Sequence, residues 1–422
     1  MSSDNQEKSQ REKKDRKKAE ELLKITEEAE RKARYQKEQK QREAKERKKA
    51  ADLLNKFENR FNEKKEHRKR NSYAKTESKT NTKQNSHKKS SIDNVSSNMF
   101  VNIFGKIGES KGLGEFSFGK FFGGFNRKFS EEELVKTLFV GTPSTTPSID
   151  EVSINYPEPW LCYKLTLTTI IIFYGFVFLF NQSQNPNVIP AIIFTGSFAV
   201  PISTLVLFFE LNIRRNVPFW VVVKLILSGA ILSFLIAEIL ASNTSSIYSS
   251  TGAWFASLIE EPAKLLALII LTLGKKKYPY ILNGLLLGAA VGCGFAAFES
   301  SGYALRGAAI KDADYMINII QLRGILAPFM HIVWTSVAGA ALWRVKKDNS
   351  FSFNHLQNRK FYMPFILMII CHALWNSPIQ LPLMGTLVIC GLIAWIVALS
   401  LVNLGIEQIS EEKSGKKVFK NI

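Results

Sequence analysis

From about residue 160 onward, the chain is a succession of long apolar runs, and these runs restrict its fold more than any other feature. Each run is close to the length of about 20 residues that an α-helix needs to cross the hydrocarbon core of a bilayer. We therefore predict an all-α, polytopic membrane bundle of eight transmembrane helices. The expected spans are residues 163–181, 188–209, 218–240, 252–273, 280–304, 323–345, 361–380 and 383–404.

Basic residues in the connections predict the orientation of this bundle. Connections on one side carry Arg214 and Arg215, the lysines at 275–277, and the basic stretch at 344–360. Connections on the other side are uncharged or, at 306–323, have their basic residues offset by two aspartates. Lys and Arg collect on the cytoplasmic side of membrane proteins. Both termini are therefore expected in the cytoplasm, and a bacterial plasma membrane is the expected location.

The part of the chain before the spans is polar and basic. Residues 1–72 are expected to form a charged cytoplasmic arm, helical or disordered, followed by a polar linker at 73–98 and a Phe/Gly-rich juxtamembrane segment at 99–160. The arm is either simply solvated or in contact with anionic lipid. Nucleic acid is not an expected partner, because the aromatic residues that stack on bases are lacking. The spans form a domain at 161–405, and 406–422 form a cytoplasmic tail.

The Phe/Gly-rich residues 99–129 allow two interpretations. They either lie on the membrane surface as an interfacial segment, or pack as a small folded patch on the cytoplasmic ends of the spans. The alternation of phenylalanine with glycine and lysine is compatible with both.

Two adjacent glutamates, Glu260 and Glu261, interrupt the fourth apolar run. One carboxylate at the centre of a membrane helix costs about 2.5–3.5 kcal/mol, and ionisable residues placed there usually mark function. Lys264 follows at a spacing of four and three residues, so it shares their helical face. Pro262 removes a backbone donor and is expected to kink the helix. The pair therefore predicts a functional site inside the membrane.

Three further runs carry polar residues at a matching depth: Glu299 in the fifth, His331 in the sixth, and His372 with Asn376 in the seventh. Counted from the predicted span ends, Glu260, Glu299, His331 and His372 lie about 8–12 Å below the outer face, at 1.5 Å per residue. A face of small residues on the fifth span is expected to dock against the fourth, which would bring Glu299 toward the glutamate pair. That face consists of Gly284, Gly288, Gly292 and Ala296.

This set of side chains suits the hydrolysis of a peptide bond. A carboxylate can accept a proton from water, and imidazoles can bind a metal or stabilise an oxyanion. Two histidines and a glutamate are also a ligand set of Zn²⁺, with a second glutamate as base. The hypothesis gives catalysis to Glu260, Glu261, Lys264 and Asn376, and Zn²⁺ binding or oxyanion stabilisation to Glu299, His331 and His372. The alternatives are packing histidines with a structural ion pair, and the proton relay of a proton-coupled transporter.

The motifs that hold these residues resemble the PrsW family of intramembrane proteases over roughly residues 160–405. They are Glu260-Glu-Pro-Ala-Lys264, the Gly288-to-Glu299 stretch, His331 with Trp334, and His372-Ala-Leu-Trp-Asn376. That family is similar in turn to the membrane-embedded CAAX prenyl endopeptidases. This chain has Glu299 where the CAAX group has histidine, and Lys264 near where that group has arginine. These departures weaken the transfer of a prenylated substrate to this chain.

The resemblance implies an intramembrane endopeptidase that cuts a membrane-embedded or membrane-anchored protein, in the founding pathway an anti-sigma factor. The functional positions of the family correspond to Glu260, Glu261, Glu299 and His372, with His331 as the further expected histidine. Two mechanisms stay open: a metalloprotease with Zn²⁺, and a glutamate protease without metal.

Overall fold

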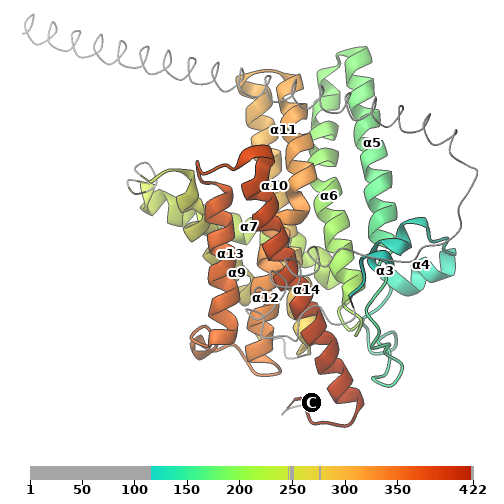
Figure 1. Cartoon of the computed structure of the whole chain (residues 1–422). Helices are drawn as coiled ribbons and strands as arrows, with labels where there is room; N and C mark the ends of the chain where they lie inside the picture. The colour runs from blue at the N-terminus through green and yellow to red at the C-terminus, as the bar shows by residue number, and fades with distance from the viewer. Residues whose placement is uncertain (1–115, 246, 248–250, 275–276, 420–422) are drawn as a thin grey trace, which may run out of the picture. The chain divides into compact units, whose positions relative to one another are not determined.

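The computed structural model describes residues 116–245, 247, 251–274 and 277–419. Every regular element within these residues is a helix, which confirms the all-α prediction. Two short helices, α3 (Phe118–Gly123) and α4 (Glu131–Leu138), precede the long ones. The long helices, shown in Figure 1, are α5 (Leu161–Ser183), α6 (Ile189–Leu211), α7 (Phe219–Asn243), α9 (Ala256–Thr272), α10 (Ile281–Ile310), α11 (Ala313–Leu326), α12 (His331–Lys346), α13 (Arg359–Trp375) and α14 (Gly385–Lys413).

Six stretches of the described chain are long and apolar enough to cross a membrane, which confirms a multi-pass membrane protein. They contain α5, α6, α7, α10, α11 joined to α12, and α14. The two remaining predicted spans correspond to α9 and α13, which have 17 residues each. This length lies at the short end of the range for transmembrane helices. The number of eight crossings therefore stays a prediction.

Two of the predicted spans differ from the helices that form. The sixth, expected at 323–345, is broken: α11 ends at Leu326, a 3₁₀ turn follows, and α12 begins at His331. Pro328 has no backbone N–H for a continuing helix, and Met330 leaves the helical region at φ −117° and ψ −136°. His331 therefore starts a helix. The eighth span continues to Lys413, so the predicted tail begins inside α14.

The small-residue face of α10 packs against α12, and the expectation that it docks on the fourth span is wrong. A Cβ atom added to Gly288 would lie 2.3 Å from the carbonyl oxygen of Thr335, and one on Gly292 would lie 2.4 Å from that of His331. A Cβ atom added to Gly339 of α12 would likewise lie 2.2 Å from the carbonyl oxygen of Gly284. Small residues on both helices permit this contact, and it holds His331 against α10.

The described part of the Phe/Gly-rich segment packs on the start of α5. The Phe121 side chain is buried, and its carbonyl accepts a hydrogen bond from the Tyr163 hydroxyl at 2.7 Å. The carbonyl of Phe125 accepts another from Lys164 Nζ at 2.8 Å. This favours the folded patch for residues 116–129. The arm at 1–72, the linker at 73–98 and residues 99–115 lie outside the described residues, so their predictions stay open.

Candidate active site

Four helices bring the predicted polar residues together. Glu260, Glu261 and Lys264 lie in the first half of α9, which continues through Pro262. His331 opens α12, and His372 lies in the last turn of α13 with Asn376 as the cap. Glu299 extends from α10. The hydrogen bonds and ion pairs below join all seven residues into one cluster, as the sequence predicted.

The centre of this cluster is an ion pair buried from solvent. Lys264 Nζ lies 2.6 Å from Glu261 Oε1, and both side chains are at most 1% exposed. Lys264 Nζ also lies 2.7 Å from His331 Nδ1, and Glu261 Oε1 lies 2.8 Å from His372 Nδ1. Two side chains of α9 therefore fix the imidazoles of α12 and α13.

These contacts determine which nitrogen of each histidine carries the proton. The Lys264 ammonium can only donate, so His331 Nδ1 accepts and its Nε2–H points to Glu299 Oε2, at 2.9 Å. The Glu261 carboxylate can only accept, so His372 Nδ1–H donates to it. The Nε2 atom of His372 then accepts from Asn376 Nδ2 at 3.0 Å. Each imidazole therefore turns an unprotonated nitrogen toward the centre of the site.

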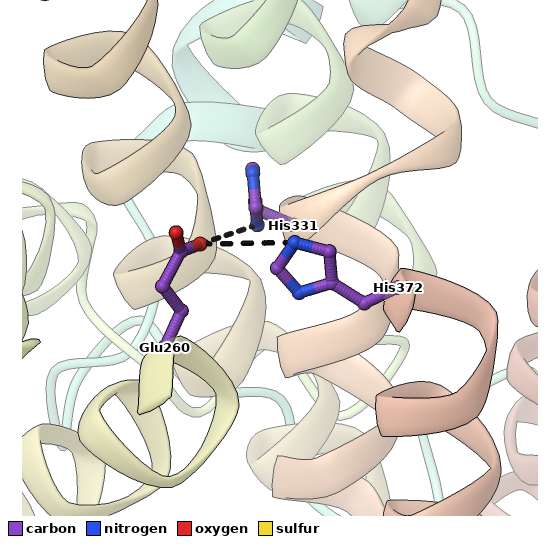
Figure 2. Close-up of side chains that lie close together, drawn as sticks. All are labelled: Glu260, His331 and His372. Atoms are coloured by element: carbon purple, nitrogen blue, oxygen red, sulfur yellow. Dashed lines mark ion pairs between the residues drawn. The ribbon is translucent and has the colours of Figure 1, made fainter. Parts of the chain in front are cut away.

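Glu260 faces these two nitrogens, as Figure 2 shows. Its Oε2 atom lies 4.0 Å from His331 Nδ1 and 3.8 Å from His372 Nε2. This oxygen is buried and has no hydrogen-bond partner within the described structure. A buried carboxylate oxygen is costly to leave unpaired. Three acceptor atoms therefore face one point, and a cation could occupy it once Lys264 and Asn376 release the two nitrogens.

The surroundings hold the two histidines in place from several directions. Glu299 Oε2 accepts from the Arg323 guanidinium at 2.5 Å, and Arg323 Nε donates to Ser300 Oγ at 2.9 Å. The Trp334 ring stacks on the His372 imidazole with ring centroids 4.6 Å apart. Phe295 meets the edge of His331 at 5.1 Å. These contacts restrict the rotation of both imidazoles.

The site opens into a cavity of about 390 Å³ between α7, α9 and α10. Glu260 and Glu299 both line this cavity, whereas Glu261 and Lys264 do not. The side chains of Glu260 and Glu299 are 18% and 17% exposed, in contrast to 1% for Glu261. Of the two adjacent glutamates, Glu260 is therefore the one that can meet a substrate.

The residues at the centre fit a metal ion. Donor atoms of Glu260, His331 and His372 all lie within 4.8 Å of one another, and two histidines with a glutamate form a ligand set of catalytic zinc sites. The outer nitrogen of each imidazole contacts a carboxylate, Glu299 for His331 and Glu261 for His372. Metal-bound histidines characteristically have this second contact. The unpaired Glu260 oxygen is where a ligand would be expected.

Sequence reasoning named seven residues of this cluster and missed two. Arg323 was counted as a charge of an outer connection, because the predicted sixth span began there. The Trp334 side chain is named from the sequence only as part of a motif with His331, with no role, although its ring stacks on His372. Its position three residues after His331, on the same face of a helix, was the available signal.

The fold and the cluster define a multi-pass membrane protein with a buried carboxylate–histidine centre that is equipped to bind a metal ion or activate water. Residues 217–402, which include the whole cluster, match the model of the PrsW family intramembrane metalloproteases. This region of the chain is similar to that family. No curated protein and no solved structure matches the chain. Similarity to a family of membrane peptidases does not favour the transporter alternative.

Proposed function

We propose that this protein is an intramembrane endopeptidase that hydrolyses peptide bonds of membrane-embedded or membrane-anchored proteins. The observation that carries the proposal is the Glu260 carboxylate, whose unpartnered oxygen faces two unprotonated imidazole nitrogens at the edge of a cavity. A water molecule at this point could donate a proton to Glu260 and would have access to a peptide carbonyl. The family match supports the same reaction class.

In this proposal Glu260 holds the attacking water and accepts its proton, which then passes to the leaving amine. Glu261 and Lys264 keep the two imidazoles oriented from the buried side. Asn376 uses one amide hydrogen on His372, and its second can stabilise the carbonyl oxygen that becomes negative during attack. Glu299 orients His331 and is itself held by Arg323.

If a divalent metal ion is bound, Glu260, His331 and His372 would hold it, and Zn²⁺ is the best match to the ligand types. Lys264 and Asn376 would then release the imidazole nitrogens, and Glu260 would be a ligand rather than the base. Such an ion would supply a nucleophilic water at neutral pH and polarise the carbonyl group. Glu299 then supports a ligand rather than acting as one, since its contact with the site is the outer nitrogen of His331. A regulated substrate such as an anti-sigma factor stays a prediction of the resemblance.

Eight membrane crossings and cytoplasmic termini also belong to this proposal. With α9 and α13 counted as short spans, the connections that carry Arg214, Arg215, Lys277 and the 344–360 stretch all fall on one side. The side with the lower positive charge is then the outer one. The contact of the basic arm with anionic lipid, and the plasma membrane as location, are proposed on the same charge argument.

Cleavage of a synthetic single-span peptide of about 20 apolar residues by the detergent-purified protein tests this function. We expect Glu260→Gln to lower the rate by about 10²–10⁴-fold, the usual contribution of a general base, with the fold retained. Glu132→Gln, on the exposed surface of α4, serves as the control that keeps activity. Full activity of Glu260→Gln would overturn the assignment.

Metal analysis of the same preparations separates the two mechanisms. We expect the wild-type protein to carry one zinc-type ion per chain and His331→Ala and His372→Ala to lose it. An active wild-type protein without metal would reject the ion and leave Glu260 as the sole activator of water.

A further inference from the structure

The cavity beside Glu260 lies between α7 and α10. These two helices are in close contact near Gly229 and Gly294 and separate beyond them. A Cβ atom added to Gly294 of α10 would lie 2.1 Å from the carbonyl oxygen of Ile226 on α7. A Cβ on Gly229 would likewise come within 3.0 Å of Val291. Glycine on each helix therefore allows the two backbones to meet at this level.

Toward the ends at Asn243 and Ile310, the same two helices form the walls of the cavity. Its lining is Phe234, Ala237, Glu238 and Ala241 from α7, Phe295, Glu299, Gly302, Tyr303 and Arg306 from α10, and Ala256, Ile259 and Glu260 from α9. We call this space the α7–α10 cleft. A Cβ added to Gly302 would meet no atom within 4 Å, so this part of the wall faces open space.

The lining changes in character from the site outward. Phe295, Ile259 and Ala237 are buried and form an apolar cluster beside Glu260. Glu238 and Arg306 are exposed and lie on opposite walls, one on α7 and one on α10. An occupant would therefore have an apolar part next to the reacting centre and a polar part farther along.

The volume of the cleft limits what can enter. One turn of an α-helix about 10 Å across and 5.4 Å high fills roughly 420 Å³, close to the 390 Å³ of the cleft. A whole transmembrane helix is several times larger. A few residues of a peptide, including one large side chain, therefore fit inside the cleft.

We infer that the α7–α10 cleft is the substrate-binding site, resting on the proposed peptidase function. It binds a locally unwound turn of a single transmembrane segment, with a large apolar side chain in the open part of the cleft beside Gly302 and Ala241. Ala241 and Gly302 are specificity-determining residues, since their small size leaves the space for that side chain. The polar flank of the substrate lies between Glu238 and Arg306.

Filling the cleft from Gly302 tests this assignment by activity. Two single-span peptides are compared that differ only at the residue before the bond cleaved by the wild-type protein, Ala in one and Phe in the other. We expect Gly302→Phe to lower kcat/KM for the Phe peptide at least about 10-fold more than for the Ala peptide, as for a pocket changed in size. Gly175→Phe is the matched control, because Gly175 of α5 also has nothing within 4 Å. Equal losses of kcat/KM on both peptides, or no loss, would overturn the assignment of the cleft as the substrate-binding site.

A second measurement does not depend on cleavage. The four native cysteines are buried, so Gly302→Cys and Gly175→Cys each add one accessible thiol for a maleimide. We expect the Phe peptide to slow labelling at position 302 at least about 5-fold and to leave position 175 unchanged. If the peptide does not slow labelling at position 302, the assignment of the cleft as the substrate-binding site is overturned, even if the protein cleaves peptides. Protection without any cleavage would support the cleft and count against the peptidase function.

Discussion

At the scale of single residues, the side chain that holds the site together is Lys264. It is fully buried between Glu261 and His331, at 2.6 and 2.7 Å. Methionine has a similar length but no charge, so Lys264→Met leaves the Glu261 carboxylate buried without its cation. Loss of one partner of a buried ion pair costs about 3–5 kcal/mol. We expect the free energy of unfolding in detergent to fall by that amount, measured by thermal or denaturant unfolding.

An exposed pair in the same chain is the control for this experiment. Lys136 and Glu132 on α4 also lie 2.6 Å apart, but their side chains are 71% and 75% exposed. Lys136→Met should leave stability unchanged, because exposed ion pairs contribute little. A similar result for both variants would contradict the role given to Lys264.

The members of the site were predictable from sequence, but their individual roles were not. An ionisable side chain inside an apolar run has few alternatives to a shared polar cavity, and this argument found Glu260, Glu261, His331 and His372. Adjacent residues on a helix point about 100° apart. Which glutamate faces the cavity depends on how α9 is rotated against its neighbours, and the sequence of α9 alone does not contain that rotation.

At the scale of secondary-structure elements, the contact between α10 and α12 positions His331. A Cβ atom added to Gly292 would lie 2.4 Å from the carbonyl oxygen of His331, so the glycine permits this close contact. Gly292→Ala must push the two backbones apart, at a cost of about 1–3 kcal/mol for an overpacked contact. We expect lower thermal stability together with loss of peptide cleavage, since His331 moves with the start of α12. Gly175→Ala, with open space around it, should change neither quantity; a neutral Gly292→Ala would refute the close contact.

A second element-scale prediction concerns the beginning of α5. Glu210 of α6 accepts hydrogen bonds from the backbone N–H groups of Trp160, Leu161 and Cys162, at 2.8–2.9 Å. A helix N-terminus leaves such donors unsatisfied without a partner. Hydrogen bonds to a charged group contribute about 1.5–3 kcal/mol, so Glu210→Gln should lower the unfolding midpoint. The exposed Glu158→Gln is the control, and an equal midpoint for both variants would contradict the capping role.

Helix positions were predictable because each apolar run has the length of a membrane span. The break at 327–330 was not predicted, because the apolar pattern continues through Pro328 and an internal proline does not always end a helix, as α9 shows by continuing through Pro262. The partner of the α10 glycine face was also not predictable from α10 itself. Small residues permit close approach by any helix, and Gly339 on α12 provides the matching surface.

At the scale of the whole molecule, the site lies toward one end of the helices. Glu260 is near the start of α9, His331 starts α12, and His372 is near the end of α13. These ends lie away from the connections that carry Arg214 and the 344–360 stretch. The charge pattern therefore places the site nearer the outer face of the membrane, provided that α9 crosses.

Single cysteines on two connections decide this orientation and the crossing of α9 together. Asn187 precedes α6 and Gln357 precedes α13, and both are exposed, whereas the native cysteines are buried. If α9 crosses, the chain passes through the membrane five times between the two positions, in α6, α7, α9, α10 and α11 joined to α12. The two positions then lie on opposite sides of the membrane. We expect an impermeant maleimide to label Asn187→Cys on intact cells, and Gln357→Cys only after the membrane is opened. Labelling of both on intact cells would show that α9 does not cross, and the reversed pattern would place the site toward the cytoplasm.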